Sequence, residues 1–172
     1  MKDPKVLLSE EVISQRVDEL GQKITQDYQG EEIVILCILK GAFIFASDLI
    51  RSIDLPLSVE FMTLSSYGDQ TESSGEVKVV SDLPFYLTNK NILIVEDIVD
   101  TGLTINTLMQ KLQDHHPKSV KLASFLVKPE KIFHPVQIDY TGFEIEDKFV
   151  VGYGLDYAQK YRNLSFVGYF ES

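Results

Sequence analysis

The chain has 172 residues, of which 44% are hydrophobic and 24% charged, and its formal net charge is -10. This length and composition predict one soluble domain with a core of its own. The acidic excess argues against a nucleic-acid partner and against an anionic membrane surface, because both carry negative charge themselves. A small anionic ligand stays open, since its binding depends on local donors and not on net charge.

The single cysteine, Cys37, lies in the apolar run IVILCIL and has no partner for an internal disulfide. We therefore expect a buried, unreactive thiol and not a nucleophile. No N-terminal stretch has the composition of a signal peptide, and no run approaches the roughly 20 apolar residues of a membrane span. The expected location is the cytoplasm.

Apolar residues at helical spacing predict a helix over Ser9–Tyr28, with Ser9 as its N-cap. The continuous apolar stretch Glu32–Leu39 predicts a strand that is covered on both faces. A helix over Lys40–Ile53 and a strand over Leu57–Tyr67 are expected next.

The second half of the chain continues this alternation. The expected elements are strands over Val77–Leu83 and Asn91–Asp97, a helix over Thr104–Gln113, strands over Lys121–Lys128 and Val136–Phe143, and a last segment from Lys148 of mixed strand and short-helix character. Strands that alternate with helices indicate an α/β protein with a mostly parallel sheet flanked by helices.

Three of the predicted strands end in polar or glycine residues: LKG begins at Leu39, VED at Val95, and VK follows Leu126. In parallel sheets, ligands bind beyond the carboxyl ends of the strands. The coincidence therefore predicts one shared site at this edge of the sheet.

The stretch Asp100–Thr104, DTGLT, joins a predicted strand to a predicted helix. The first N–H groups of a helix have no partners within the helix and can bind a phosphate. Gly102 allows close approach of the backbone, and the hydroxyls of Thr101 and Thr104 add donors. Simple capping of the helix by Asp100 or Thr101 would explain the same residues.

Glu96 and Asp97 stand just before this stretch, at the end of an apolar strand. Carboxylates accept hydrogen bonds from sugar hydroxyls and hold hydrated Mg²⁺. A ligand with both a phosphate and vicinal hydroxyls would suit both parts of the sequence. The alternative is a solvated strand end without a ligand.

The stretch Val95–Thr104, VEDIVDTGLT, resembles the phosphoribosyl-pyrophosphate signature of the type I phosphoribosyltransferases. Further segments in chain order resemble the hypoxanthine-guanine branch of that family: Leu39–Phe43, Ser65–Gly68, Leu126–Glu130 and Asp147–Asn163. The resemblance implies one domain over residues 1–172 with the type I phosphoribosyltransferase fold. A mostly parallel sheet flanked by helices would carry a small hood, formed largely by the C-terminal segment, and a flexible lid loop at about residues 65–78.

The resemblance also implies the residues that hold the phosphoribosyl group: Glu96, Asp97, Asp100, Thr101, Gly102, Leu103 and Thr104. The amides and hydroxyls from Asp100 onward would face the 5′-phosphate. Glu96 and Asp97 would hold the ribose hydroxyls and the water shell of Mg²⁺. Asp100 would lie near N7 of the purine as the catalytic general acid or base.

The remaining roles are implied in the same way. The purine would contact Lys128 at its 6-oxo group, Phe149 by stacking and Val150 through the backbone, and Asp156 would lie near the base and bind a second Mg²⁺. Pyrophosphate would contact Leu39, Lys40, Gly41 and Arg162. Ser66 and Tyr67 would belong to the lid. In this family the peptide bond that matches Leu39–Lys40 can be cis.

The residue types alone leave plainer interpretations open. Lys128 and Arg162 could be surface residues and Phe149 a core residue. The polar segment Gly68–Gly75, GDQTESSG, could be a hairpin tip and not a lid.

The function that the resemblance implies is a glycosyltransferase of purine salvage. It would join hypoxanthine or guanine to phosphoribosyl pyrophosphate, giving IMP or GMP and pyrophosphate, and would act as a homodimer or homotetramer. Two rivals are a regulator of this fold that acts on nucleic acid and a non-catalytic α/β domain. The acidic charge disfavours the first, and the carboxylates of Glu96, Asp97 and Asp100 would lack a purpose in the second. The choice among hypoxanthine, guanine and xanthine stays open.

Overall fold

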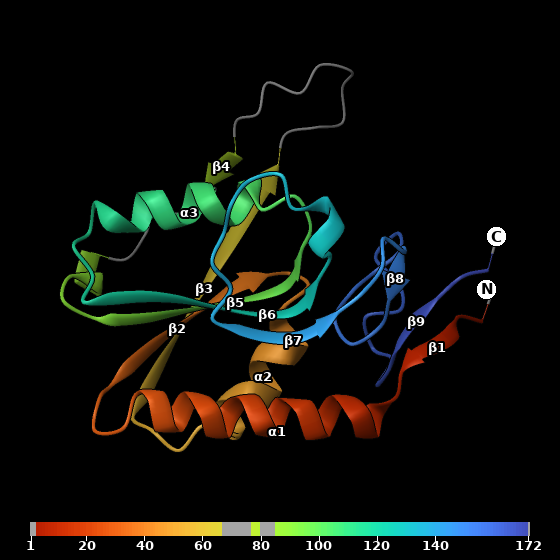
Figure 1. Ribbon diagram of the computed structural model, residues 1–172, viewed down its shortest axis with the longest axis horizontal. Coiled ribbons are helices and arrows are strands. Elements are labelled where there is room, and N and C mark those ends of the chain that lie inside the picture. Colours follow the sequence, from red (N-terminus) through yellow and green to blue (C-terminus); the bar gives the residue numbers. More distant parts are fainter. Residues whose placement is uncertain (1–2, 67–76, 80–84, 172) are drawn as a thin grey trace.

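The structure is a computed structural model that describes residues 3–66, 77–79 and 85–171 (Figure 1). Its centre is a six-stranded sheet in the order β4-β3-β2-β5-β6-β7. The strands are β2 (Ile33–Leu39), β3 (Leu57–Ser66), β4 (Val77–Val79), β5 (Asn91–Val99), β6 (Ser119–Val127) and β7 (Tyr140–Glu144). All neighbours pair in parallel except β3 and β4. The predicted α/β class is confirmed.

Helices cover both faces of this sheet (Figure 1). They are α1 (Glu10–Asp27) and α2 (Phe43–Arg51) on one face, α3 (Leu103–Gln113) on the other, and the short 3₁₀ turns η1 (Phe85–Leu87) and η2 (Pro129–Lys131). Ser9 caps α1 as predicted, because its hydroxyl accepts a hydrogen bond from the Val12 N–H at 3.4 Å. None of the helices in the described ranges has the length and apolar character needed to cross a bilayer.

The strand β2 explains how one apolar run serves two cores. Side chains alternate across a strand, so Ile33, Ile35 and Cys37 pack towards α1 and α2 while Val34 and Leu36 pack towards α3. All five are at most 2% exposed. The strand is therefore covered on both faces, as its continuous hydrophobicity predicts.

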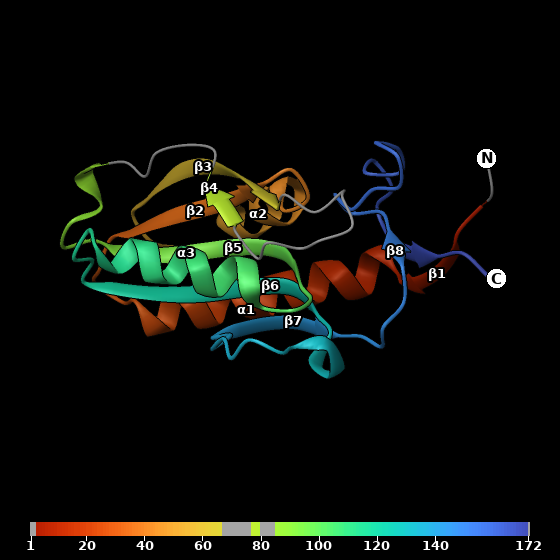
Figure 2. The same cartoon turned by 90° about the horizontal axis from the view of Figure 1, so that it is seen from above.

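A second, three-stranded antiparallel sheet lies beyond the end of the main sheet towards which β7 runs (Figures 1 and 2). Its order is β1 (Lys5–Leu8), β9 (Val167–Tyr169) and β8 (Val150–Val151). The N-terminal strand β1 pairs with the C-terminal strand β9, so both ends of the chain contribute to this small sheet. The pairing of β1 was not part of the sequence prediction, because four residues carry too little periodicity.

Several predicted elements need correction. The strand expected over Val136–Phe143 begins only at Tyr140, because the Asp139 side chain accepts the Leu122 N–H at 2.9 Å in place of a strand partner. The helix expected over Lys40–Ile53 begins at Phe43, after a turn. The short-helix character expected after Lys148 is wrong.

Left-handed backbone conformations explain the absence of a helix there. Among the residues described after Lys148, Tyr153, Ala158, Gln159 and Tyr161 have φ between 49° and 74°, which no right-handed helix accommodates. The lid prediction falls largely outside the described residues. Ser66 ends β3, whereas Tyr67 and the residues up to 76 are not described.

Candidate active site

The carboxyl ends of three parallel strands, β2, β5 and β6, lie side by side because their register is continuous from strand to strand. Beyond these ends come Lys40, Asp100 and Lys128. The Lys128 N–H donates to the Val99 carbonyl at 3.0 Å, which fixes the exit of β6 against that of β5. The peptide bond between Leu39 and Lys40 is cis, as the resemblance allows. The three polar strand ends of the sequence thus meet at one edge.

The acidic pair at the end of β5 is partly buried. Glu96 is only 8% exposed and accepts the Asp97 N–H at 3.0 Å, while Asp97 accepts the Ile98 N–H at 2.7 Å. Burial, together with the neighbouring carboxylate of Asp97, raises the pKa of the Glu96 carboxyl well above its usual range. The alternative of a solvated strand end is therefore wrong for Glu96.

Gly41 approaches the same pair from the end of β2. A Cβ atom built on Gly41 would overlap a carboxylate oxygen of Asp97. Gly41 therefore leaves room for the Asp97 carboxylate in its present position, which a larger residue would displace. The glycine of the predicted pyrophosphate loop and the carboxylate of the predicted ribose site are thus direct neighbours.

The stretch Asp100–Thr104 forms the turn between β5 and α3. Gly102 occupies the N-cap position with φ 82°, and no side chain caps the helix there. The first helical bond runs from the Asn106 N–H to the Gly102 carbonyl at 2.9 Å, so the N–H groups before it have no partner within the helix. The Thr101 hydroxyl reaches the Leu103 N–H only at 3.4 Å. The alternative of capping by Thr101 is thus present as one long bond, while the N-cap residue Gly102 has no side chain to cap the helix.

The segment after β6 braces the turn from outside. The Thr101 carbonyl accepts hydrogen bonds from the N–H groups of Phe133 at 3.2 Å and His134 at 3.1 Å. A Cβ atom on Gly102 would collide with the His134 carbonyl oxygen. Gly102 is therefore required twice, for its left-handed φ and for this close approach.

A network of two lysines and two carboxylates lies beside the turn. Lys128 is 8% exposed and donates to Asp147 at 2.9 Å. Lys131 donates to Oδ2 of Asp100 at 3.2 Å and lies 3.5 Å from Asp147. The hydrogen bond from Lys128 lowers the pKa of Asp147, and the bond to Asp100 raises the pKa of Lys131. The interpretation of Lys128 as a surface lysine is wrong.

One carboxylate oxygen of Asp100 has no hydrogen-bond partner in this network. Oδ1 of Asp100 is buried and has no hydrogen-bond partner among the described residues. A buried acceptor without a partner is unfavourable unless a ligand or water supplies the donor. The Asp100 carboxylate thus has one acceptor oxygen still to be satisfied.

Sequence reasoning missed Lys131 and did not assign a role to Asp147. Lys131 follows Lys128 by three residues, and the single turn of η2 brings both amines to the same carboxylate of Asp147. That spacing is a usable signal once the Pro129 turn is recognised. The contact between Asp147 and Lys128 spans 19 residues and has no local signal.

Phe149 and Val150 differ in exposure. Phe149 is 59% exposed and meets Tyr157 edge to face, with ring centroids 5.7 Å apart. Val150 is buried and pairs with Tyr169 in the small sheet. The interpretation of Phe149 as a core residue is therefore wrong, since its ring is available for stacking.

Asp156 and Arg162 form an ion pair in the turns between β8 and β9, with 2.8 Å between Arg162 Nη2 and Asp156 Oδ1. Arg162 Nη1 also donates to the Gly154 carbonyl at 2.7 Å, and its side chain is 20% exposed. A Cβ atom on Gly154 would collide with the Gly41 carbonyl oxygen. Arg162 is thus a structured residue, and its segment lies directly against the loop after β2.

Comparison with known proteins adds to this geometry. Residues 6–158 match the phosphoribosyl transferase domain family. The chain belongs to this family.

Individual relatives of this phosphoribosyltransferase cover nearly all of its length. The chain is 47% identical over 164 residues to the hypoxanthine-guanine phosphoribosyltransferase of Bacillus subtilis strain 168, which covers 95% of this chain and 91% of that protein. It is 46% identical over 168 residues to the enzyme of the same name from Dictyostelium discoideum, over 95% and 93% of the two chains.

A solved structure agrees with the sequence relatives. The crystal structure of a hypoxanthine-guanine phosphoribosyltransferase from Bacillus anthracis, with a HEPES molecule in the active site, has a TM-score of 0.93 and 45% identity. It covers 98% of this chain and 100% of that chain. The family resemblance of the sequence motifs is confirmed.

The acidic residues of this phosphoribosyltransferase fit a metal that is shared with a ligand. Within the described ranges, no three His, Cys, Asp or Glu side chains are placed to hold a metal ion by themselves. Yet the buried Glu96 lies beside Asp97, and a cation would stabilise the ionised carboxylates against the burial and the mutual repulsion that raise the pKa of Glu96. Mg²⁺ takes oxygen ligands, keeps several waters and commonly binds one or two carboxylates plus substrate phosphates. The donor set suits that mode of binding.

Proposed function

We propose that this protein transfers the 5-phosphoribosyl group from phosphoribosyl pyrophosphate to hypoxanthine or guanine. The products are IMP or GMP and pyrophosphate, as in purine salvage. The observation that carries the proposal is the buried, unpartnered oxygen of Asp100, next to a helix start whose first N–H groups have no partner within the helix. The names of the relatives in Bacillus subtilis and Dictyostelium discoideum support the same activity.

The phosphoribosyl subsite would use the junction of β5 and α3. The N–H groups of Gly102, Leu103 and Thr104, together with the Thr101 and Thr104 hydroxyls, would hold the 5′-phosphate. The helix start favours an anion through its dipole as well as its donors. Glu96 and Asp97 would accept hydrogen bonds from the ribose hydroxyls, so phosphate and sugar would have separate partners along one stretch.

The purine subsite would lie between the Lys128 network and the small sheet. The Lys128 amine would donate to the 6-oxo group of the base, and the exposed ring of Phe149 would stack on its face. The backbone of Val150 would meet the base edge, with Asp156 nearby. The hydrogen bond of Lys128 to Asp147 holds the amine in place before the base arrives.

The pyrophosphate subsite would combine the loop Leu39–Gly41 with Arg162. Bound Mg²⁺ would stabilise the negative charge of the leaving pyrophosphate, with Glu96, Asp97 and Asp156 as the residues that hold it or its waters. Arg162 adds a guanidinium suited to phosphate oxygens.

The protein's own part in the reaction would be to position the substrates and to handle one proton. Displacement of pyrophosphate builds positive charge on the ribose, as in glycoside chemistry. The Asp100 carboxylate would accept the proton of the purine at N7, and its unpartnered oxygen is the atom suited to do so. Lys131, bound to the other oxygen, would hold the carboxylate in place.

We also propose that the whole chain acts as one domain with the small sheet as its hood, in the cytoplasm, as a homodimer or homotetramer. The hood assignment is supported by the contact of the C-terminal segment with the loop after β2. The oligomeric state follows the resemblance to the family.

Conversion of radiolabelled bases tests the proposal. The protein is incubated with phosphoribosyl pyrophosphate, Mg²⁺ and labelled hypoxanthine, guanine, xanthine or adenine. We expect nucleotide from hypoxanthine, guanine or both, with one pyrophosphate released per nucleotide. Binding of phosphoribosyl pyrophosphate without any nucleotide from a 6-oxopurine would overturn the enzyme assignment and favour a regulator.

A further inference from the structure

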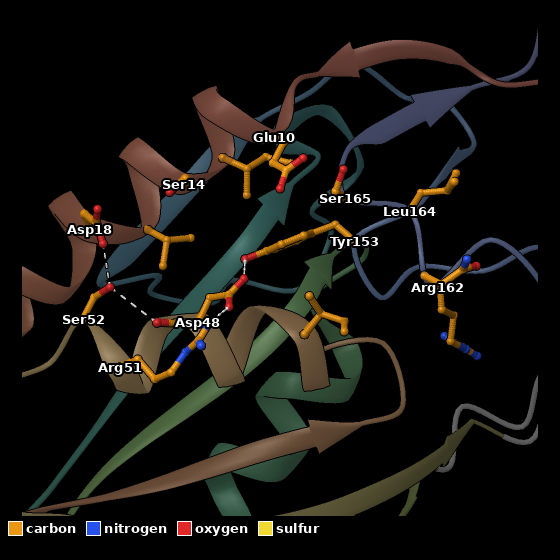
Figure 3. A pocket seen from close by; sticks show the side chains of 14 residues that line it. Glu10, Ser14, Asp18, Asp48, Arg51, Ser52, Tyr153, Arg162, Leu164 and Ser165 are labelled. Atoms are coloured by element: carbon orange, nitrogen blue, oxygen red, sulfur yellow. Dashed lines mark hydrogen bonds and ion pairs between the residues drawn. The ribbon is translucent and has the colours of Figure 1, made fainter.

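A tyrosine outside the substrate subsites joins the C-terminal segment to the helix α2. Figure 3 shows Tyr153 reaching across the rim of a cavity of about 510 Å³ towards Asp48. The phenol donates to Asp48 Oδ2 at 2.6 Å, and the other oxygen of Asp48 is bound by Arg51 at 2.5 Å. The tyrosine thus has a fixed partner on a helix.

We propose that Tyr153 and Asp48 are positioning residues that set the pyrophosphate side of the active site, an inference that rests on the proposed function. Neither residue would touch the substrate. Their hydrogen bond would hold the segment that carries Asp156 and Arg162 in register with the loop Leu39–Gly41.

The backbone around Tyr153 shows why an anchor is needed. Gly152, Tyr153 and Gly154 have φ of 98°, 49° and 97°, so three successive residues are left-handed. Glycine adopts this conformation readily, but a residue with a side chain does so only when its surroundings hold it. Tyr153 is 6% exposed, and its ring lies 4.8 Å from that of Phe125. Ring packing and the hydroxyl bond together fix the turn.

The turn then fixes the neighbouring groups. The Gly154 N–H donates to the Arg162 carbonyl at 3.0 Å, and the Gly154 carbonyl accepts the Arg162 guanidinium at 2.7 Å. Gly154 also lies against the Gly41 carbonyl so closely that no Cβ would fit. A displacement of Tyr153 would therefore move the pair of Arg162 and Asp156 relative to Gly41.

The helix α2 supports both sides of the proposed pyrophosphate subsite, the loop Leu39–Gly41 and the segment that carries Asp156 and Arg162. It begins at Phe43, two residues after Gly41, and carries Asp48 on its second turn. One end of the helix therefore continues from the pyrophosphate loop, while its middle holds Tyr153. The hydrogen bond between Tyr153 and Asp48 therefore ties the C-terminal segment to the helix and the loop before it. Its loss would let the segment move relative to the loop Leu39–Gly41.

Pyrophosphate binding by the full-length protein tests the inference. In Tyr153→Phe the phenol donor is lost while the ring stays, and we expect Kd for pyrophosphate with Mg²⁺ and KM for phosphoribosyl pyrophosphate to rise about tenfold. KM for the base should stay within about twofold. Asp48→Asn keeps an acceptor oxygen for Tyr153, so this variant should largely retain pyrophosphate binding. Asp48→Ala removes the acceptor and should bind pyrophosphate as weakly as Tyr153→Phe does.

Tyr140 provides a matched control. It is also a buried tyrosine whose hydroxyl donates to a helix carboxylate, Asp27 on α1, at 2.8 Å. Tyr140→Phe should lower Tm about as much as Tyr153→Phe and leave pyrophosphate binding unchanged. An unchanged Kd in Tyr153→Phe, or an equal rise in Tyr140→Phe, would overturn the inference. Absence of nucleotide formation by the unaltered protein would instead overturn the proposed function, because pyrophosphate binding is measured without turnover.

Discussion

Two regions of the molecule bring polar groups to the same edge of the sheet by different means. The junction from β5 to α3 uses regular elements: a strand end presents Glu96 and Asp97, and a helix start presents its N–H groups. The C-terminal segment uses left-handed turns held by distant contacts, such as the bond of Tyr153 to Asp48 across 105 residues. The first region is therefore defined locally, whereas the second depends on the rest of the fold for its shape.

This difference suggests a division of labour. A junction that is fixed by the sheet suits the part of the proposed reaction that is the same for every base, namely phosphoribosyl binding and the proton transfer proposed for Asp100. A segment that distant contacts hold in shape responds to changes elsewhere in the fold, and it carries Phe149 and Asp156, the residues proposed to face the base and the second metal. Substitutions in the two regions should therefore affect different kinetic quantities.

The largest effect is expected from Asp100→Asn in the first region. The amide cannot accept the purine proton as a carboxylate does, so kcat should fall by about 10²- to 10⁴-fold. The Kd for phosphoribosyl pyrophosphate should change little, because the amides of the turn are retained. Single-turnover kinetics with a parallel binding measurement checks this. Equal losses in turnover and binding would assign Asp100 to substrate binding.

Lys128→Ala addresses the place where both regions meet the base. The preference for 6-oxopurines over adenine should fall by about 10- to 100-fold, because the buried amine proposed to donate to the 6-oxo group is removed. The ratio of kcat/KM values for hypoxanthine and adenine measures it. Lys118→Ala is a suitable control, since Lys118 forms an exposed ion pair with Glu31. An unchanged ratio would show that Lys128 does not recognise the base.

Gly102→Ala tests the backbone requirements of the first region. The left-handed φ and the collision with the His134 carbonyl should together cost about 2–3 kcal/mol of unfolding free energy and weaken binding of phosphoribosyl pyrophosphate. Gly30→Ala is the matched control, because Gly30 has φ 79° and no atom within 4 Å of its built Cβ. It should cost about 1 kcal/mol and leave binding intact. Similar losses in both variants, measured by urea unfolding, would contradict the close-approach argument.

The smallest effect is expected at Cys37, in the core beneath both regions. Burial, with smaller contributions from Glu96 and Asp97, raises the pKa of the Cys37 thiol to about 12. The thiol stays protonated in the folded protein at pH 8, so iodoacetamide should modify it only after unfolding. Mass spectrometry of native and denatured samples checks this. Rapid modification of the native protein would show that the strand β2 opens readily.

The junction of β5 and α3 could be predicted from the sequence because its signals are local. The fourteen residues Asn91–Thr104 contain a continuous apolar strand, two carboxylates and DTGLT. Because ligands bind beyond the carboxyl ends of parallel strands, this order predicts the site. The convergence of LKG, VED and VK on one edge followed from the parallel sheet alone. Roles for individual residues came from the family resemblance and stay predictions.

The C-terminal segment could not be predicted in the same way. Its backbone includes left-handed residues such as Tyr153 and Tyr161, for which the sequence gives no preference, and its contacts span much of the chain. The pairing of β1 with β9 joins residues near opposite ends of the sequence. Lys131 could not be predicted as a site residue because its hydrogen-bond partner, Asp100, lies far from it in the sequence and is brought to it only by folding.

The central claim is that the two regions form adjacent subsites for one substrate, and separate ligand titrations test it most directly. Thr104→Val removes a hydroxyl from the first region, and Arg162→Gln removes a guanidinium from the second. Calorimetry should show GMP or IMP binding weakened about 2- to 10-fold only in Thr104→Val, and pyrophosphate binding weakened at least about 10-fold only in Arg162→Gln. Phosphoribosyl pyrophosphate should bind more weakly to both variants. If each substitution weakened nucleotide and pyrophosphate to the same extent, the account of two adjacent subsites would be contradicted.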